Sequence, residues 1–272
     1  MTTAFVLGGG GVLGAAEVGM LQALLEADVQ PDLVLGTSVG ALNGALVAAY
    51  PGDEVVRRLT ELWRAATSEE IYPDGVLRQV RRAVSTGTHL HSSAPLRRRI
   101  EAELGERTFG DLLVPFQCCA ASIERAAEHW FTEGRVVDAV MASAAVPGLL
   151  EPAEVDGEHY LDGGIVNSIP LGRAVALGAD RVFVLQVGRV ERPLTLPRRP
   201  WEVARVSFEI ARRHRFHREL AELPDHVEAH VMPSGGGSAA DDSLLAYRRF
   251  GGVTDRITRA YDASRAYLER SL

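Results

Sequence analysis

The sequence predicts an α/β fold: a mainly parallel β-sheet with helices on both of its faces. Three observations lead to this prediction, namely short apolar runs typical of buried strands, glycine-rich turns after them, and apolar stretches of helical length after the turns. Ala4–Leu7 is the first apolar run, and Asp32–Leu35 is the second. Because parallel strands end at the same edge of a sheet, the turns after these two runs are expected to face each other.

The turn after the second strand carries the most informative pattern of the chain. Gly36-Thr37-Ser38-Val39-Gly40 is a G-x-S-x-G between that strand and a predicted helix, Ala41–Tyr50, which Pro51-Gly52 ends. This context is typical of a nucleophile elbow, in which small residues at Gly36 and Gly40 permit a tight turn. The helix would then point its first N–H groups at the place where negative charge develops in acyl transfer. The alternative is an ordinary strand–helix turn in which Ser38 caps the helix.

The glycine run after the first strand, 8–11, precedes a helix that is expected from about Gly14 to Ala27. The spacing of Gly9, Gly11 and Gly14 also fits the dinucleotide fingerprint, but that site needs an acidic residue at the end of the second strand, where none stands. We therefore expect the N–H groups of Gly9, Gly10 and Gly11 to form an oxyanion hole. A side chain at Gly10 is expected to clash with substrate or to be incompatible with a positive φ.

The third motif is Asp162-Gly163-Gly164, which follows a predicted strand at Glu158–Leu161. Alone it indicates a hairpin or an Asx turn. Beside the other two motifs, it supplies a general base for Ser38. A Ser-His-Asp triad of the α/β-hydrolase type, using His226 or His230, is the competing hypothesis.

The three motifs together resemble the patatin-like phospholipases. That family has G-G-G-x-x-G, then G-x-S-x-G about two dozen residues later, then D-G-G/A, and this chain carries Gly9–Gly14, Gly36–Gly40 and Asp162–Gly164 in that order. Ala142–Pro147 also resembles the segment that precedes the catalytic Asp in the family. One departure is Leu13, which stands where many members have Arg or Lys. The resemblance covers residues 4 to about 188.

The resemblance implies a patatin-like Ser-Asp hydrolase fold and hydrolysis of a carboxylic ester of a lipid, as in a phospholipase A or a lysophospholipase. Ser38 and Asp162 would then be the catalytic dyad, and no cofactor would be needed. A catalytically silent lipid-binding module is the alternative from another class. The acyl-chain length, the headgroup and the oligomeric state stay open.

The rest of the chain is expected to complete one domain, residues 1–272, around a motif-bearing core at about 4–188. Residues 67–92 are irregular and are interpreted either as a cap over the site or as a surface loop. The predicted helix 201–223 carries five arginines, which fits either contact with a membrane surface or a solvated face over an apolar stripe. Further elements are expected at 53–66, 94–104, 116–122, 128–132, 136–144, 153–155, 170–177, 182–187, 227–232 and 253–268. Among them, Asp53 is expected to cap the helix 53–66, and the strand 153–155 is expected to form a hairpin with 158–161 about Asp156-Gly157.

The composition excludes several classes of protein. A formal net charge of −7 gives no general attraction to nucleic acid or anionic lipid, so no nucleic-acid partner is expected. The 272 residues include no lysine, which excludes a Schiff-base lysine and a Walker lysine. Cys118 and Cys119 are expected to be core residues, and no metal-binding pattern is visible. No signal peptide or run of about 18 apolar residues appears, so a cytoplasmic protein is expected, with peripheral membrane contact left open.

Overall fold

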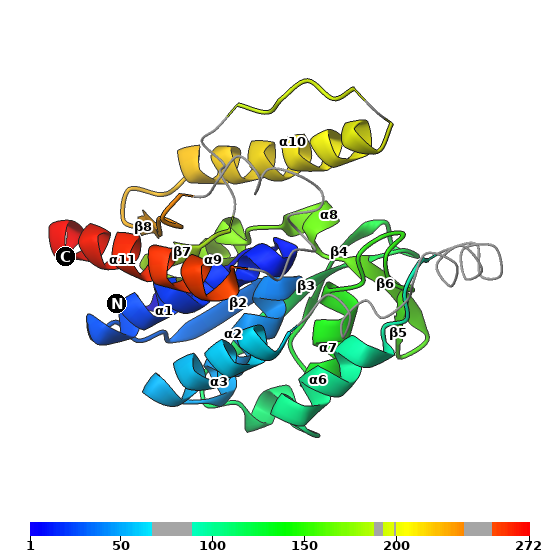
Figure 1. The fold of residues 1–272 in the computed structure, drawn as a ribbon, viewed down its shortest axis with the longest axis horizontal. Coiled ribbons are helices and arrows are strands. Elements are labelled where there is room, and N and C mark those ends of the chain that lie inside the picture. Colours follow the sequence, from blue (N-terminus) through cyan, green and yellow to red (C-terminus); the bar gives the residue numbers. More distant parts are fainter. Residues whose placement is uncertain (67–88, 188–192, 199, 237–251) are drawn as a thin grey trace.

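The structure is a computed structural model that describes residues 1–66, 89–187, 193–198, 200–236 and 252–272. It confirms the α/β fold (Figure 1). The described strands form one sheet in the order β5-β6-β3-β2-β1-β7-β8, and β4 pairs with β3. The strands are β1 Thr3–Leu7, β2 Leu33–Thr37, β3 Phe116–Ser122, β4 Ala127–Phe131, β5 Ala153–Val155, β6 Glu158–Asp162, β7 Arg181–Leu185 and β8 Glu228–Val231.

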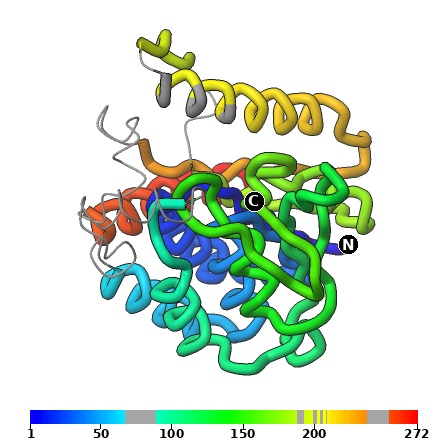
Figure 2. The backbone as a smooth tube through the Cα atoms, turned by 90° about the vertical axis from the view of Figure 1, so that its right-hand side faces the viewer, coloured from blue at the N-terminus to red at the C-terminus, as the bar shows by residue number. Residues whose placement is uncertain are grey.

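Helices cover both faces of this sheet (Figure 1). Those described are α1 Ala15–Glu26, α2 Val39–Ala49, α3 Gly52–Ala65, α6 Ala94–Leu104, α7 Val136–Ser143, α8 Gly164–Asn167, α9 Leu171–Ala176, α10 Pro200–Ala221 and α11 Val253–Ser271, with short 3-10 turns η1 Gly11–Gly14 and η2 Phe109–Asp111. Helices α1, α2, α3 and α11 pack together on one face. Helices α9 and α10 lie on the other, and both views show α10 as its outermost layer (Figure 2).

The central strands are parallel, as expected. Strand β1 pairs in parallel with β2 and β7, and β2 pairs in parallel with β3. Because Leu7 lies opposite Gly36, the glycine run and the G-x-S-x-G turn leave the sheet at the same edge. Strand β6 runs antiparallel to β3 from beyond that edge, and the register stops its last residue, Asp162, opposite Ala120, next to the Cys119 that pairs with Thr37.

The core follows from the alternation of side chains along the buried strands. Phe5 and Leu7 of β1 point into the larger apolar cluster, which includes α1, α2, α3 and α11. Ala4 and Val6 point into the smaller cluster, which α9 and Phe216 of α10 complete. A central strand that is buried on both sides is apolar at nearly every position, which is why the sequence showed it as a continuous run.

Most element boundaries agree with the sequence, and one cap does not. The β5–β6 hairpin turns at Asp156-Gly157, whose φ angles of 52° and 79° are those of a type I′ turn. Helix α3 begins at Gly52 after an extended Pro51, so Asp53 lies in its first turn and does not cap it as expected. There its carboxylate still faces the positive end of the helix dipole.

The segments after residue 200 belong to the same layers as the motif-bearing part. Strand β8 extends the sheet beside β7, and α11 packs along α1. No helix in the described ranges is long and apolar enough to cross a membrane. Residues 67–88 of the segment 67–92, interpreted as a cap or a loop, lie outside the described residues. Further along it, the N–H groups of Leu90 and His91 donate to the carbonyls of Gly148 and Leu149.

Candidate active site

Ser38 occupies a strained turn between β2 and α2. Its φ of 57° and ψ of −122° are rare for a residue with a side chain, and such a conformation costs about 1–3 kcal/mol. Close backbone packing enforces it. A Cβ at Gly36 would lie 2.3 Å from the Gly40 carbonyl, and one at Gly40 would lie 2.2 Å from the Leu7 carbonyl. Both glycines of the motif are therefore required by lack of space.

Asp162 is the hydrogen-bond partner of the Ser38 hydroxyl. The Ser38 Oγ donates to Asp162 Oδ2 at 2.6 Å, across 124 residues of sequence. Strand β3 joins the two, because it pairs with β2 on one side and places Ala120 opposite Asp162 on the other. A Cβ at Gly163 would lie 2.1 Å from the Cys119 carbonyl, so only glycine permits this approach of the turn to β3.

The environment of Asp162 keeps its carboxylate basic. The residue is 5% exposed, and Ser38 is 7% exposed. Burial raises the pKa of Asp162 to about 6, because the charged form loses hydration. Hydrogen bonds from the Ser38 hydroxyl and from the Gly164 N–H, which lies 2.7 Å from Oδ1, lower that pKa and offset part of the increase. A carboxylate with this pKa can accept a proton near neutral pH.

The histidines considered for a triad lie elsewhere. His230 is on β8, where its ring stacks on Phe183 and its Nδ1 is 3.1 Å from the Tyr267 hydroxyl. His226 is exposed in the turn before β8, at the opposite edge of the parallel sheet from Ser38. His159 points away from the neighbouring Asp162 and pairs with Glu124 at 2.8 Å.

The glycine loop lies directly against the nucleophile. A Cβ on Gly9 would be 3.4 Å from the Cβ of Ser38. The Gly9 N–H donates to the Ser168 carbonyl at 2.9 Å, so it is not the free oxyanion donor that was expected and instead anchors the loop. Within the described part of the chain, the N–H groups of Gly10 and Gly11 have no hydrogen-bond acceptor.

The reason expected for a glycine at position 10 needs a correction. Its φ of 173° is extended backbone that any residue can adopt. A Cβ there would instead lie 2.1 Å from Cγ2 of Val187, which follows β7. The steric limit at Gly10 is therefore a neighbouring side chain of the protein, and the positive φ belongs to Gly11, at 56°.

Ser143 and Asn167, to which the sequence analysis assigned no function, form hydrogen bonds with the nucleophile turn. The N–H of Ser38 donates to Ser143 Oγ at 2.8 Å, and that hydroxyl donates to the Cys119 carbonyl at 2.5 Å. The Thr37 hydroxyl donates to the Asn167 carbonyl at 2.8 Å. A single buried serine in the apolar Ala142–Pro147 stretch was the available signal for Ser143. Asn167 had no comparable signal.

A buried acid connects the glycine loop to the nucleophile helix. The Asn43 amide nitrogen of α2 donates to Glu17 at 2.7 Å and to the Gly14 carbonyl at 3.0 Å. The Trp63 indole N–H of α3 donates to the Asn43 amide oxygen at 3.1 Å. Burial raises the pKa of Glu17 well above its usual range, which favours the neutral acid at this position. Polar contacts thus link α1, α2 and α3 beneath the loop.

The arginines of α10 do not form one solvated face. Arg212 is buried beside Glu209, and Arg215 reaches the carbonyl of Val166 on α8 at 2.6 Å. Arg218 is exposed. Leu13 is partly buried against the core, so the charge that many patatin-like proteins place there is absent from that position. Among the described residues, no three His, Cys, Asp or Glu side chains are grouped as a metal site requires.

Comparison with known proteins identifies one family. A patatin-like phospholipase family model matches residues 5–175. The chain is 31% identical over 194 residues to the lysophospholipase nte1 of Aspergillus terreus, covering 68% of this chain and 12% of that protein. It is 32% identical over 195 residues to the rat patatin-like phospholipase domain-containing protein 7, covering 71% of this chain and 14% of that protein.

One further relative and two solved structures are also similar to this chain. A patatin-like phospholipase domain-containing protein of Caenorhabditis elegans is 35% identical over 188 residues, with 68% of this chain and 14% of that protein covered. Among solved structures, VipD from Legionella pneumophila matches 98% of this chain and 66% of its own at 14% identity, with a TM-score of 0.45. The type III effector ExoU matches 99% and 53% at 15% identity, with a TM-score of 0.41. The curated relatives are thus several times longer than this chain.

Proposed function

This chain belongs to the patatin-like phospholipase family, and on that premise we propose that it is a serine hydrolase that cleaves carboxylic ester bonds of lipids. The hydrogen bond of 2.6 Å between Ser38 Oγ and the buried carboxylate of Asp162, at a strained elbow beside the glycine loop, carries the proposal. A nucleophile bonded to its base is the arrangement that covalent catalysis needs.

The reaction would proceed in two steps. Ser38 Oγ attacks the ester carbonyl carbon while its proton passes to Asp162, and the tetrahedral oxyanion is held by the N–H groups of Gly10 and Gly11. Collapse breaks the carbon–oxygen bond to the alcohol, which leaves with the proton from Asp162. Water then attacks the acyl-enzyme, Asp162 takes its proton, and collapse returns that proton to Ser38 and releases the acid.

The substrate class is proposed from the names of the relatives. The relatives are called lysophospholipase or patatin-like phospholipase, and this supports a phospholipid or lysophospholipid ester. The family model ends at residue 175. The same proposal places the protein in the cytoplasm, with peripheral membrane contact as the alternative.

A fluorophosphonate probe tests the enzyme against the lipid-binding alternative. The wild type is expected to be labelled at Ser38, to hydrolyse p-nitrophenyl butyrate and to release fatty acid from lysophosphatidylcholine. Ser38→Ala should remove all three activities with a change in unfolding free energy below about 1 kcal/mol. The matched control is Ser207→Ala, an exposed serine on α10, which should keep all three. An unlabelled, inactive wild type, or a folded Ser38→Ala variant with normal turnover, would reject the proposal.

A further inference from the structure

Helix α8 contacts all three pieces of the candidate site. It begins at Gly164, whose N–H donates to Asp162 Oδ1 at 2.7 Å. Its last residue, Asn167, accepts the hydroxyl of Thr37, the residue before the nucleophile, at 2.8 Å. The next residue, Ser168, accepts the N–H of Gly9 at 2.9 Å. A displacement of α8 would therefore move the base, the elbow and the oxyanion loop together.

Helix α8 is too short to hold this position by itself. It has four residues, and a single turn of helix is not stable without tertiary contacts. Its apolar anchoring is weak as well, because the Ile165 side chain is 40% exposed. The support for α8 has to come from neighbouring elements.

Arg215 of α10 holds α8 by one direct contact and by one contact through Glu128 of β4. Its Nη1 donates to the Val166 carbonyl at 2.6 Å, and its Nη2 lies 3.1 Å from Glu128 Oε2 on β4. The same Glu128 oxygen accepts the Asn167 side-chain amide at 3.1 Å. One guanidinium thus fixes the backbone of α8 directly and its last side chain through Glu128.

The guanidinium is itself oriented by a second carboxylate. Arg215 Nε donates to Glu219 Oε1 at 2.8 Å, one turn later on α10. The other Glu219 oxygen accepts the N–H of Gly172, in the first turn of α9, at 2.9 Å. All three nitrogens of the planar guanidinium therefore have a partner: Nε contacts Glu219, Nη1 the Val166 carbonyl and Nη2 Glu128. A lysine ammonium cannot contact three groups in these directions. Side-chain choice at position 215 is therefore restricted by geometry as well as by charge.

We propose that Arg215 is a positioning residue for catalysis: by clamping α8, it aligns Asp162, the Ser38 elbow and the glycine loop. The inference rests on the proposed hydrolase function. It also gives α10, which lies outside the residues matched by the family model, an indirect part in the active site. Arg215 acts through α8, so its loss should lower kcat and leave KM nearly unchanged.

The test compares Arg215→Gln with Arg218→Gln, an exposed arginine three residues later on the same helix. Arg215→Gln is expected to lower kcat for p-nitrophenyl butyrate about 10- to 100-fold, since misplacement by about 1 Å can cost about 100-fold. Its KM should stay within about threefold, and the rate of fluorophosphonate labelling should fall together with kcat. Arg218→Gln should match the wild type in all three measurements.

Two further variants keep the test decisive if Arg215→Gln does not fold. Arg215→Lys should recover only part of the rate, and Glu128→Gln should lower kcat in the same direction, as each retains part of the network. The double variant of Arg215→Gln and Glu128→Gln should be less damaging than the product of the single effects.

The inference and the proposed function fail in different ways. A folded Arg215→Gln or Glu128→Gln variant with kcat within twofold of an active wild type overturns the role of Arg215 alone. A loss of kcat equal to the loss of folded protein would also overturn it, because the role would then be structural only. A wild type that is neither labelled nor active rejects both.

Discussion

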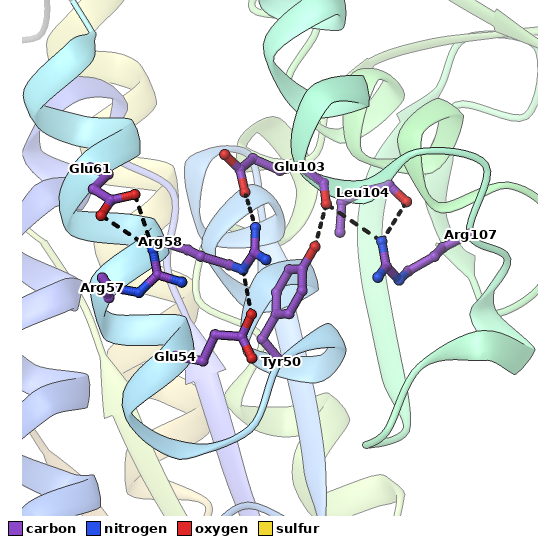
Figure 3. A network of polar contacts seen from close by, with 8 residues as sticks. All are labelled: Tyr50, Glu54, Arg57, Arg58, Glu61, Glu103, Leu104 and Arg107. Carbon is purple, nitrogen blue, oxygen red and sulfur yellow. Dashed lines mark hydrogen bonds and ion pairs between the residues drawn. The ribbon is translucent and has the colours of Figure 1, made fainter.

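Helix α2 has a polar cluster at each end, and the two clusters differ in how their charges are compensated. At the C-terminal end, the Tyr50 hydroxyl donates to the Glu103 carbonyl at 2.5 Å, and the Arg58 guanidinium lies 4.0 Å from the centre of the Tyr50 ring (Figure 3). Arg58 also pairs with Glu54 at 2.9 Å and with Glu103 at 3.3 Å. Each of these two carboxylates faces an arginine and partly faces solvent.

At the N-terminal end, no arginine of the described ranges donates a hydrogen bond to the carboxylate of Asp162. It accepts from the Ser38 hydroxyl and the Gly164 N–H, and it is almost fully buried. A partly exposed cluster of paired charges connects helices and stabilises them modestly. A buried carboxylate without a counter-charge costs stability and keeps a proton affinity that catalysis can use. Four measurements can test this difference between the two ends of α2.

The largest effect is expected for Asp162→Asn, which should change activity and stability in opposite directions. Turnover should fall about 10²–10⁴-fold, because an amide cannot accept the proton of Ser38. The double variant with Ser38→Ala should be little worse than either single variant. Turnover is measured with p-nitrophenyl butyrate, and near-normal turnover in folded Asp162→Asn would remove Asp162 as the base.

The stability change follows from the pKa of about 6. A carboxyl whose folded pKa is raised contributes its stability below the unfolded pKa and loses it as pH rises through the folded value. A shift of about 2 pH units corresponds to about 3 kcal/mol by pH 7 to 8. Asp162→Asn should therefore unfold at higher urea than the wild type at pH 8, and the difference should shrink towards pH 4. An equal difference at both pH values would contradict the cost assigned to the buried charge.

Gly10→Ala should be the next most damaging change. The new Cβ would collide with Val187 and shift the loop away from the oxyanion, and loss of one such donor costs about 10²–10³-fold in kcat. Adding Val187→Ala should restore most of the lost turnover by making room. If the second substitution restores nothing, the collision is with substrate, as the sequence had suggested.

The acidic limb of the pH–rate profile should lie near pH 6, with a tenfold loss per pH unit below it, because Asp162 must be ionised to accept the proton. The reference pKa of histidine, about 6.5, is too close for the limb alone to identify the base. Alanine variants of His159, His226 and His230 should keep both the limb and the rate. A folded variant that loses more than about 100-fold would restore the triad hypothesis.

The smallest effect is expected at the other end of α2. Tyr50→Phe removes one hydrogen bond to Glu103 and keeps the ring beneath Arg58, so unfolding should become easier by about 1 kcal/mol. The value of kcat should stay unchanged. Urea unfolding and turnover are measured on the same preparation. A fall in kcat above fivefold would mean that the two ends of α2 are coupled.

Local sequence was sufficient for the motifs and for most of the elements. The strand before Ser38, the glycine at position 36 beside the Gly40 carbonyl and the turn at Asp156-Gly157 follow from contacts within a few residues. The parallel arrangement of β1 and β2 followed from the helix between them, which put both turns at one edge. That is why the sequence alone predicts that Ser38 and the glycine loop lie together.

Long-range packing decided what each group at that edge does. Three hydrogen bonds join residues that are far apart in sequence: Gly9 N–H to the Ser168 carbonyl, Ser38 N–H to Ser143 Oγ, and Arg215 to the Val166 carbonyl. No local periodicity of the sequence encodes such pairs. Burial also set the pKa of Asp162, because hydration is lost only when the whole sheet and its helices surround the carboxylate. The order of the three motifs along the chain thus indicated which residues meet. Only the assembled fold determined the distances between these residues, the pKa of Asp162 and which backbone N–H groups have no acceptor among the described residues.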